Sequence, residues 1–167
     1  ISGDNIQSIY KEEGSIARLF YKDIDNSNIK LLGSLAKVNL LMNYHSSVND
    51  FMFEDSLIPT VYIQKYVTKI GAHSFQDSQL SRLEIENWST EPHLSYIGDF
   101  AFSNTQLSFI NILDTVTYIG EAAYEKNNNI TDLRYSSSMT YVPISCFANC
   151  NTTGKRCDTI RGFSPNI

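Results

Sequence analysis

Apolar residues recur along the chain in a frame of about 22 positions. The clearest pair of segments is 48–63 (VNDFMFEDSLIPTVYI) and 70–85 (IGAHSFQDSQLSRLEI), which align without a gap. The same frame recurs from position 97 and, with one extra residue, from position 119. Segments that approximate Leu-x-x-Leu-x-Ile begin at positions 16, 35, 58, 80, 107 and 130. We therefore predict six repeat units, followed by a partial one around Val142 and Phe147.

Each unit predicts two short segments that bury one face. The alternation Leu83-x-Ile85 has a period of two, which is typical of a strand with one buried face. A second segment begins at an Ile-Gly pair, and an aromatic residue five positions after that Ile is expected to point back into the interior. These aromatic residues are Phe53, Phe75, Phe102, Tyr124 and Phe147.

The position after the Ile of that pair holds Gly71, Gly98 and Gly120 in three units, and Asn49 and Asp25 in earlier ones. Gly, Asn and Asp tolerate a positive φ best, so we predict a left-handed or tight-turn backbone there. The last copy has Pro143 at this place, and proline cannot adopt that conformation. The regular coil is therefore expected to break near this proline.

A unit of this length cannot bury its own apolar face, whereas stacked copies form a continuous core. Stacking places the strands side by side in a parallel sheet. The predicted fold is an α/β-type repeat solenoid with a short-stranded parallel sheet on the concave face and mostly irregular or short helical convex segments. We assign 1–150 to this solenoid and 151–167 to an irregular C-terminal cap or tail.

Four segments share a strand, an Ile-Gly or equivalent pair and a closing aromatic: VTKIGAHSF at 67–75, LSYIGDFAF at 94–102, VTYIGEAAY at 116–124 and MTYVPISCF at 139–147. They resemble the BspA-like class of leucine-rich repeat proteins, closely over 48–150 and more loosely over 1–47. The chain departs from that pattern at Tyr124, where Phe is usual, and at His73-Ser74, where Ala is usual. The resemblance implies a leucine-rich repeat solenoid. It also implies a surface protein that binds host or extracellular matrix proteins.

Residues between the apolar positions of each strand face outward on the concave sheet. One row across the six units reads Phe20, Asn39, Tyr62, Glu84, Asn111 and Arg134; the row before it contains Arg82 and Phe109. Protein interfaces favour aromatic and arginine anchors in a polar surround. We therefore predict partner binding at Phe20, Tyr62, Arg82, Glu84, Phe109 and Arg134. The alternative is an ordinary sheet surface, because exposed aromatics are common and stabilise strands by lateral pairing.

The unit that begins at position 80 is longer than the others and carries an insertion at 87–93. Insertions in solenoids form loops, often functional ones, and this one holds the sole tryptophan, Trp88. We favour a Trp88 that folds back over an edge of the solenoid; the alternative is a contact with a partner.

Composition and charge exclude several classes of protein. The chain has 167 residues, of which 42% are hydrophobic and 19% charged, so it is neither a disordered tail nor a coiled coil. A net charge of −5 argues against nucleic acid or an anionic membrane surface as the main partner. No apolar run reaches the roughly 20 residues of a membrane helix. The chain begins at Ile1 without a methionine, which is compatible with a fragment of a longer repeat protein.

No motif for catalysis, phosphate binding or a cofactor is present, so we predict no catalytic residue, no metal and no cofactor. The three histidines, His45, His73 and His93, fall in different units and are expected at the surface or in turns. Cysteines 146, 150 and 157 form C-x3-C-x6-C, one ligand short of a structural zinc site. Cys146 and Cys150 are interpreted as small core residues with free thiols. One disulfide with Cys157 is the alternative in an oxidising compartment.

The leading functional hypothesis is a non-enzymatic module that binds another protein through its concave sheet. The resemblance places it at a cell surface or outside the cell, in adhesion or in host or matrix-protein recognition. The alternative is an intracellular structural or scaffold subunit, cytoplasmic or cytoskeletal, docked in a larger assembly. Further repeats or subunits are expected at the solenoid ends.

Overall fold

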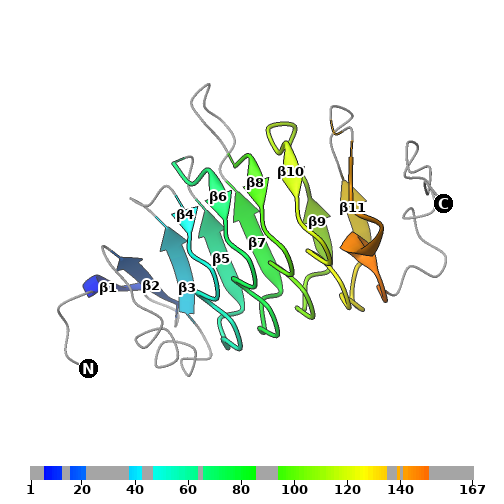
Figure 1. Cartoon of the computed structure of the whole chain (residues 1–167). Helices are drawn as coiled ribbons and strands as arrows, with labels where there is room; N and C mark the ends of the chain where they lie inside the picture. Colours follow the sequence, from blue (N-terminus) through cyan, green and yellow to red (C-terminus); the bar gives the residue numbers. More distant parts are fainter. Residues whose placement is uncertain are drawn as a thin grey trace.

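A computed structural model places the repeat units as stacked coils. It describes residues 6–12, 16–21, 38–42, 47–63, 66–85, 94–134, 139 and 141–150, the first three ranges by their backbone alone. Figure 1 shows the strands as a row that follows the chain, from β1 at one end to β11 at the other. The fold is thus a solenoid of β-strands, as the repeat frame predicted. The predicted tail, 151–167, lies outside the described residues.

The strands are short and fall into three sheets. A five-stranded sheet has the order β1-β2-β3-β5-β7, a four-stranded sheet the order β10-β8-β6-β4, and a two-stranded sheet the order β11-β9. All neighbours are parallel except β1 and β2, which are antiparallel. The strand bounds are β1 Ile6–Glu12, β2 Ile16–Tyr21, β3 Val38–Met42, β4 Ser47–Val48, β5 Thr60–Ile63, β6 Lys69–Ile70, β7 Arg82–Ile85, β8 Tyr96–Ile97, β9 Phe109–Asn111, β10 Tyr118–Ile119 and β11 Asp132–Arg134.

From β4 onward each coil contributes one strand to each side of the solenoid. Within β5 the burial alternates, so that Val61 and Ile63 face the core while Thr60 and Tyr62 face outward. Helix is confined, in the described part of the chain, to the single 3₁₀ turn η1 at Ile144–Phe147. The expectation of a parallel sheet with mostly irregular connecting segments is therefore confirmed.

The register of the third strand differs from the repeat frame. The frame aligned Asn39 with Phe20 and Tyr62, but the structure pairs Leu41 with both of them. The error is a shift of two residues. Side chains alternate with a period of two, so a shift of two leaves the same residues facing the core, and the apolar pattern does not distinguish the two registers.

The aromatic column predicted for the interior is confirmed. Each of its rings stacks on the next, with centroids 5.0 Å apart for Phe53 and Phe75, and 5.3 Å for Phe75 and Phe102. The stack continues through Tyr124 at 5.1 Å and Phe147 at 5.4 Å. One aromatic residue per coil thus ties successive coils together beneath the sheets.

Of the two alternatives predicted at Gly71, Gly98 and Gly120, the left-handed backbone is wrong, whereas a tight turn does begin there: the N–H of Ala101 donates to the carbonyl of Gly98 at 3.3 Å. The left-handed residues lie two positions later, at Phe51, His73, Phe100 and Ala122, and again near the end of each turn, at Asp55, Asp77, Asn104, Lys126 and Asn149. Glycine is needed for a different reason. A Cβ at Gly98 would stand 2.6 Å from the backbone nitrogen of Ala72 in the preceding coil.

The break predicted near Pro143 is confined, in the described part of the chain, to one ladder of hydrogen bonds. The N–H of Gly120 donates to the carbonyl of Ile97 at 2.8 Å, and that of Gly98 donates to Ile70 at 2.9 Å. Proline has no N–H and cannot continue this ladder. The chain instead enters η1, for which Pro143 is the residue before the first turn. The turn that follows still pairs with the preceding coil, since the N–H of Tyr124 donates to the carbonyl of Cys146 at 2.9 Å.

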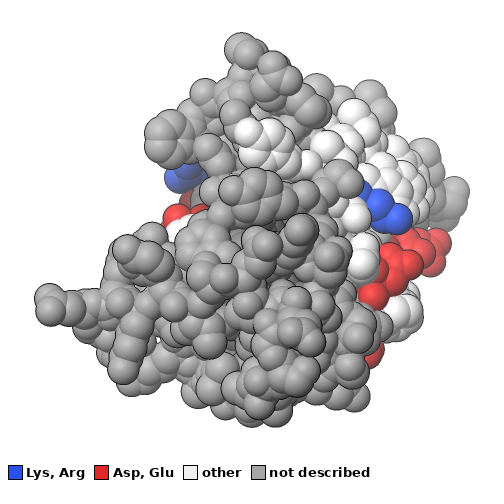
Figure 2. All heavy atoms as spheres, turned by 90° about the vertical axis from the view of Figure 1, so that its left-hand side faces the viewer, with Lys and Arg blue, Asp and Glu red and all other residues white. Residues whose placement is uncertain are grey.

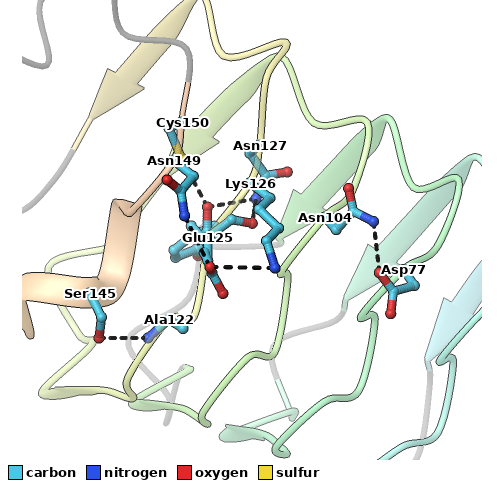
Figure 3. A network of polar contacts seen from close by, with 10 residues as sticks. Asp77, Asn104, Ala122, Glu125, Lys126, Asn127, Ser145, Asn149 and Cys150 are labelled. Atoms are coloured by element: carbon cyan, nitrogen blue, oxygen red, sulfur yellow. Dashed lines mark hydrogen bonds and ion pairs between the residues drawn. The ribbon is translucent and has the colours of Figure 1, made fainter.

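Polar side chains fix the turns of neighbouring coils against one another (Figure 3). Asn127 is buried, and its Nδ2 donates to the carbonyls of Phe102 at 2.7 Å and Tyr124 at 2.8 Å. Thr105 donates its hydroxyl to Oδ1 of Asn127 at 2.5 Å. On the surface, Asn104 donates to Asp77 at 2.7 Å. The two bonds donated by Asn127 satisfy backbone carbonyls of the turns, and the other two join side chains of neighbouring coils.

Candidate protein-binding face

The outward rows of the five-stranded sheet hold four of the predicted site residues. The register places Phe20, Leu41, Tyr62 and Glu84 in one row, and Arg82 in the neighbouring row beside Thr60. Tyr62 and Glu84 are half-buried, whereas Arg82 is exposed. The side chain of Phe20 lies outside the described part of the structure. The register of the sheet therefore brings these four positions into two neighbouring rows.

The two charges on β7 are paired with each other. Nη2 of Arg82 lies 2.5 Å from Oε1 of Glu84. Both side chains are substantially exposed to solvent, so the pair contributes little to stability. Its effect on the surface is to cancel the two charges locally. This part of the concave face is therefore polar without a net sign.

Phe109 and Arg134 lie on the separate two-stranded sheet. Phe109 is 41% exposed, and the guanidinium carbon of Arg134 stands 5.3 Å from the centre of its ring. Nε of Arg134 also lies 3.5 Å from Oδ2 of Asp132. The arginine thus holds an exposed aromatic ring by a cation–π contact. The structure does not bring this pair into the sheet that carries Tyr62.

A pocket separates the two groups of residues. The solenoid's concave sheet is interrupted between β7 and β9, which form no ladder with each other. In Figure 1 the separation of β7 from β9 is wider than that of β5 from β7. A cavity of about 570 Å³ opens there, lined by Ser81, Arg82, Leu83, Glu84, Ile85, Leu107, Ser108, Phe109, Ile110, Asn111 and Tyr124. Its volume is typical of ligand-binding pockets.

The floor of this pocket is apolar. Leu83 and Ile85 occupy the same core rows as Val61 and Ile63, which are 0% and 1% exposed. In β7, however, both residues are only half-buried. The open sheet therefore leaves core-type side chains accessible in a pocket whose rim carries Arg82, Glu84, Phe109 and Asn111.

The interruption coincides with the longer repeat unit. The four-stranded sheet stays closed across it, since β6 pairs with β8 in register. The turns stay closed as well, because the N–H of Phe75 donates to Ala101 at 2.8 Å. Only the concave side opens. The insertion lies outside the described residues, so the role predicted for Trp88 stays a prediction.

A second row of exposed aromatics escaped the sequence analysis. Tyr96 and Tyr118 stack on the outer face of the four-stranded sheet with centroids 4.5 Å apart, and Nζ of Lys69 lies 5.1 Å from the ring of Tyr96. Tyr141 is 74% exposed. Desolvation, with a smaller effect of Asp99, raises the pKa of Tyr118. The repeat does indicate this row of tyrosines, because Tyr precedes Ile or Val at the same place in LSYIG, VTYIG and MTYV.

Most acidic side chains of the described residues lie on the turns, whereas Glu84 and Asp132 lie on strands of the concave face. Those on the turns are Asp50, Glu54, Asp55, Asp77, Asp99, Asp114, Glu121 and Glu125. Figure 2 shows most of the visible acidic side chains near its right edge and a smaller group near its left edge. In the described part of the chain most of the acidic side chains therefore lie on turn segments, while Glu84 borders the pocket between β7 and β9.

The histidine and cysteine predictions can be followed in part. His73 lies in a turn, as expected, stacked between Phe51 and Phe100 at 4.7 and 5.0 Å. Cys146 is buried with a free thiol, and Cys150 donates its thiol to the carbonyl of Tyr124 at 3.1 Å. His45, His93 and Cys157 lie outside the described residues.

No three histidine, cysteine or carboxylate side chains among the described residues converge as metal ligands would. No helix in that part of the chain has the length and apolar character needed to cross a bilayer.

A known crystal structure shares this architecture. The crystal structure of the pneumococcal vaccine antigen PcpA matches with a TM-score of 0.59 and 17% identity, over 90% of this chain and 42% of that one. A leucine-rich repeat protein from Eubacterium ventriosum matches with a TM-score of 0.49 and 18% identity, over 77% of this chain and 41% of that one. The chain thus spans less than half the length of these two proteins. None of the curated proteins compared with the chain is significantly similar to it.

The sequence also matches a family model directly. The model, described as a BspA type leucine-rich repeat region, matches in 6 copies over residues 46–157, which is more than half of the chain. Strands in a parallel solenoid, the repeated Ile-Gly pairs and this match agree with one another. The chain belongs to the BspA type leucine-rich repeat family.

Proposed function

We propose that this repeat module binds another protein through its concave face, at the pocket between β7 and β9. The pocket itself is the observation that carries the proposal, because it combines an accessible apolar floor with a rim of aromatic and charged side chains. Buried aromatic and arginine anchors surrounded by polar contacts dominate the energy of protein interfaces. The rim offers both kinds of anchor in Phe109 and Arg82.

The proposed contact residues are those predicted from the sequence. Arg82 and Glu84 border the pocket on β7, and Phe109, steadied by Arg134, borders it on β9. Tyr62 is next to Glu84 in the register and extends the surface across β5. Phe20 is in the same row on β2. A partner that fills the pocket and also lies along the sheet would reach these residues.

A location at the cell surface or outside the cell fits this role. PcpA, which shares the fold, is described as a pneumococcal vaccine antigen, and such antigens are exposed to the host. We propose adhesion or recognition of host or matrix proteins as the finer function. Labelling intact cells with a membrane-impermeant reagent tests the location. Labelling that succeeds only after lysis would favour the intracellular scaffold instead.

The binding face is tested with a triple variant, Phe20→Ala, Tyr62→Ala and Phe109→Ala. Partner capture from host cell-surface and matrix extracts should fall at least tenfold, because these substitutions remove the aromatic anchors. The matched control is Tyr66→Ala, Tyr118→Ala and Tyr141→Ala, which removes three exposed aromatics elsewhere. Circular dichroism verifies that both variants fold. Equal capture by a folded concave variant and the wild type would refute the proposed face.

A further inference from the structure

The pocket between β7 and β9 is bordered on both sides by the edge of a strand. In a parallel ladder a residue directs its N–H and its carbonyl to the same neighbour, and successive residues alternate between the two neighbours. The N–H of Arg82 donates to the carbonyl of Pro59, beside β5, at 3.0 Å. Leu83 and Ile85 therefore direct their backbone groups away from β5, toward the pocket.

The opposite edge follows the same rule. The N–H of Ile112 donates to the carbonyl of Arg134 at 2.8 Å, and the carbonyl of Ser108 accepts from Asp132 at 3.3 Å. Successive residues alternate in direction, so the N–H and carbonyl of Ile110, midway between Ser108 and Ile112, also point toward β11. Phe109 and Asn111 consequently direct their N–H and carbonyl groups into the pocket.

The two edges are not joined to each other in the described part of the chain. The nearest backbone bond between these coils runs from the N–H of Gln106 to the carbonyl of Leu80 at 2.9 Å, just before the pocket. Past that point the sheet is open, although β9 goes on to pair with β11. Unpaired strand edges bind other strands readily, because their N–H and carbonyl groups are available for hydrogen bonds.

From these edges we infer that the pocket accepts an extended segment of the partner protein as an added strand between β7 and β9. This inference rests on the proposed function and specifies its mode of recognition. A single inserted strand would satisfy both edges at once, at the ordinary spacing of about 4.7–4.9 Å to each neighbour. Since β7 has four residues and β9 has three, the segment would pair over about three to four residues.

The side chains around the pocket define the chemistry of that segment. Alternate residues of an inserted strand point to opposite faces. Those facing inward would contact Leu83, Ile85, Ile110 and Tyr124, so they should be apolar. Those facing outward would lie between the paired Arg82 and Glu84 and the ring of Phe109, where no single charge is favoured. The partner segment is therefore an alternation of apolar and uncharged polar residues.

The chain's own insertion does not fit this description. Residues 86–93 read ENWSTEPH, with two glutamates, a proline and one large apolar residue. This sequence lacks apolar residues at alternate positions, and proline cannot donate to a ladder. A segment from another protein is the better match to both edges and to the floor.

The first test uses a fluorescein-labelled peptide, PTVYIQK, which copies residues 59–65 and so the strand that already pairs with β7. We expect saturable binding by fluorescence anisotropy below about 1 mM, a range typical of weak recognition. The same peptide with N-methyl groups on its valine and tyrosine should bind at least tenfold more weakly, because one donor is lost on each side. Equal binding by both peptides, or no binding at all, would overturn the inference.

A chain variant locates the peptide in the pocket. Leu83→Lys places a charge on the apolar floor and should weaken peptide binding at least tenfold. The matched control is Thr117→Lys, at an exposed position on the other side of the solenoid, which should leave binding unchanged. Both variants are checked for folding by circular dichroism. Undiminished binding by a folded Leu83→Lys variant would place the peptide elsewhere.

Hydrogen exchange measured by NMR separates strand addition from binding by side chains alone. Saturating peptide should slow the amides of Leu83, Ile85, Phe109 and Asn111 at least tenfold. The amides of Arg82, Glu84 and Ile110, already paired with β5 or β11, should not change. Binding without this alternation would overturn strand addition and leave the concave face as the binding surface. Conversely, the alternation with unaltered partner capture by the triple alanine variant would refute the proposed function alone.

Two other occupants are distinguished in the same samples. Sedimentation of the free chain detects a dimer, which the peptide should not dissociate if the pocket is open to a partner. Peptide binding that appears only when residues 86–93 are replaced by a short glycine-serine linker would show that the chain fills its own pocket. Either a dimer broken by the peptide or a requirement for the linker would overturn a partner segment as the occupant.

Discussion

At Gly98 the backbone of one coil lies directly against the backbone of the preceding coil. A Cβ there would meet Ala72 N at 2.6 Å and Ala72 Cα at 2.9 Å. These are main-chain atoms held in the turn ladder, so they cannot move aside as the end of a flexible side chain would. The sequence identified the right residue for the wrong reason, because glycine's lack of a side chain serves close approach as well as positive φ.

This distinction makes a prediction at the residue scale. Gly98→Ala should lower the free energy of unfolding by about 1–3 kcal/mol, as overpacking does. The control is Lys126→Gly, at an exposed residue whose φ is 59°. This substitution should leave the free energy of unfolding unchanged or raise it, because a residue with a side chain is disfavoured in left-handed backbone by roughly 1 kcal/mol. Urea denaturation measures both; the reverse ranking would contradict the role of Gly98.

At the scale of elements, aromatic residues serve two separate purposes. Phe102 is fully buried and stacks on both Phe75 and Tyr124. Phe109, a few residues later on β9, is exposed at the pocket rim. Phe102 thus joins coils, while Phe109 is available to a partner. Period and spacing predicted this division, because the aromatic column and the strand rows occupy different places in the repeat.

Replacing each of these phenylalanines by leucine separates the two purposes. Phe102→Leu should cost about 1–3 kcal/mol, since two ring stacks, each worth roughly 0.5–1.5 kcal/mol, are lost from the core. Phe109→Leu should change stability by less than about 0.5 kcal/mol, as surface substitutions do. Thermal and urea unfolding test this contrast. Comparable losses in the two variants would mean that the column does not hold the coils together.

At the scale of the whole molecule, two buried groups tie stability to pH. Burial raises the pKa of the Tyr124 phenol and the Cys146 thiol above their ordinary values of 10.0 and 9.0. A raised pKa means that the folded state favours the protonated form. The stabilisation is complete below the unfolded pKa and is lost as pH rises above it.

The free energy of unfolding should therefore decline above about pH 9, by up to about 1.4 kcal/mol per pH unit for each group. Cys146→Ala removes one of them and is compatible with the fold, because Ala101 and Ala123 occupy the same place in other coils. Between pH 9 and 10 the free energy of unfolding of the Cys146→Ala variant should therefore fall less steeply than that of the wild type. Urea denaturation across this range makes the comparison, and identical slopes would contradict a buried, protonated Cys146.

Sequence by itself determines the solenoid, its parallel strands and its aromatic column. Each unit leaves an apolar face that only the next unit can cover, and the regular spacing of the apolar positions along the chain predicts this stacking. Tertiary structure decides the register of β3, because a shift by two residues preserves every inward position. It also decides that the sheet opens between β7 and β9. The strand that contains Leu83 has the same apolar alternation whether the sheet is closed or open. Only the separation of the backbones exposes the Leu83 side chain and leaves two strand edges opposite each other.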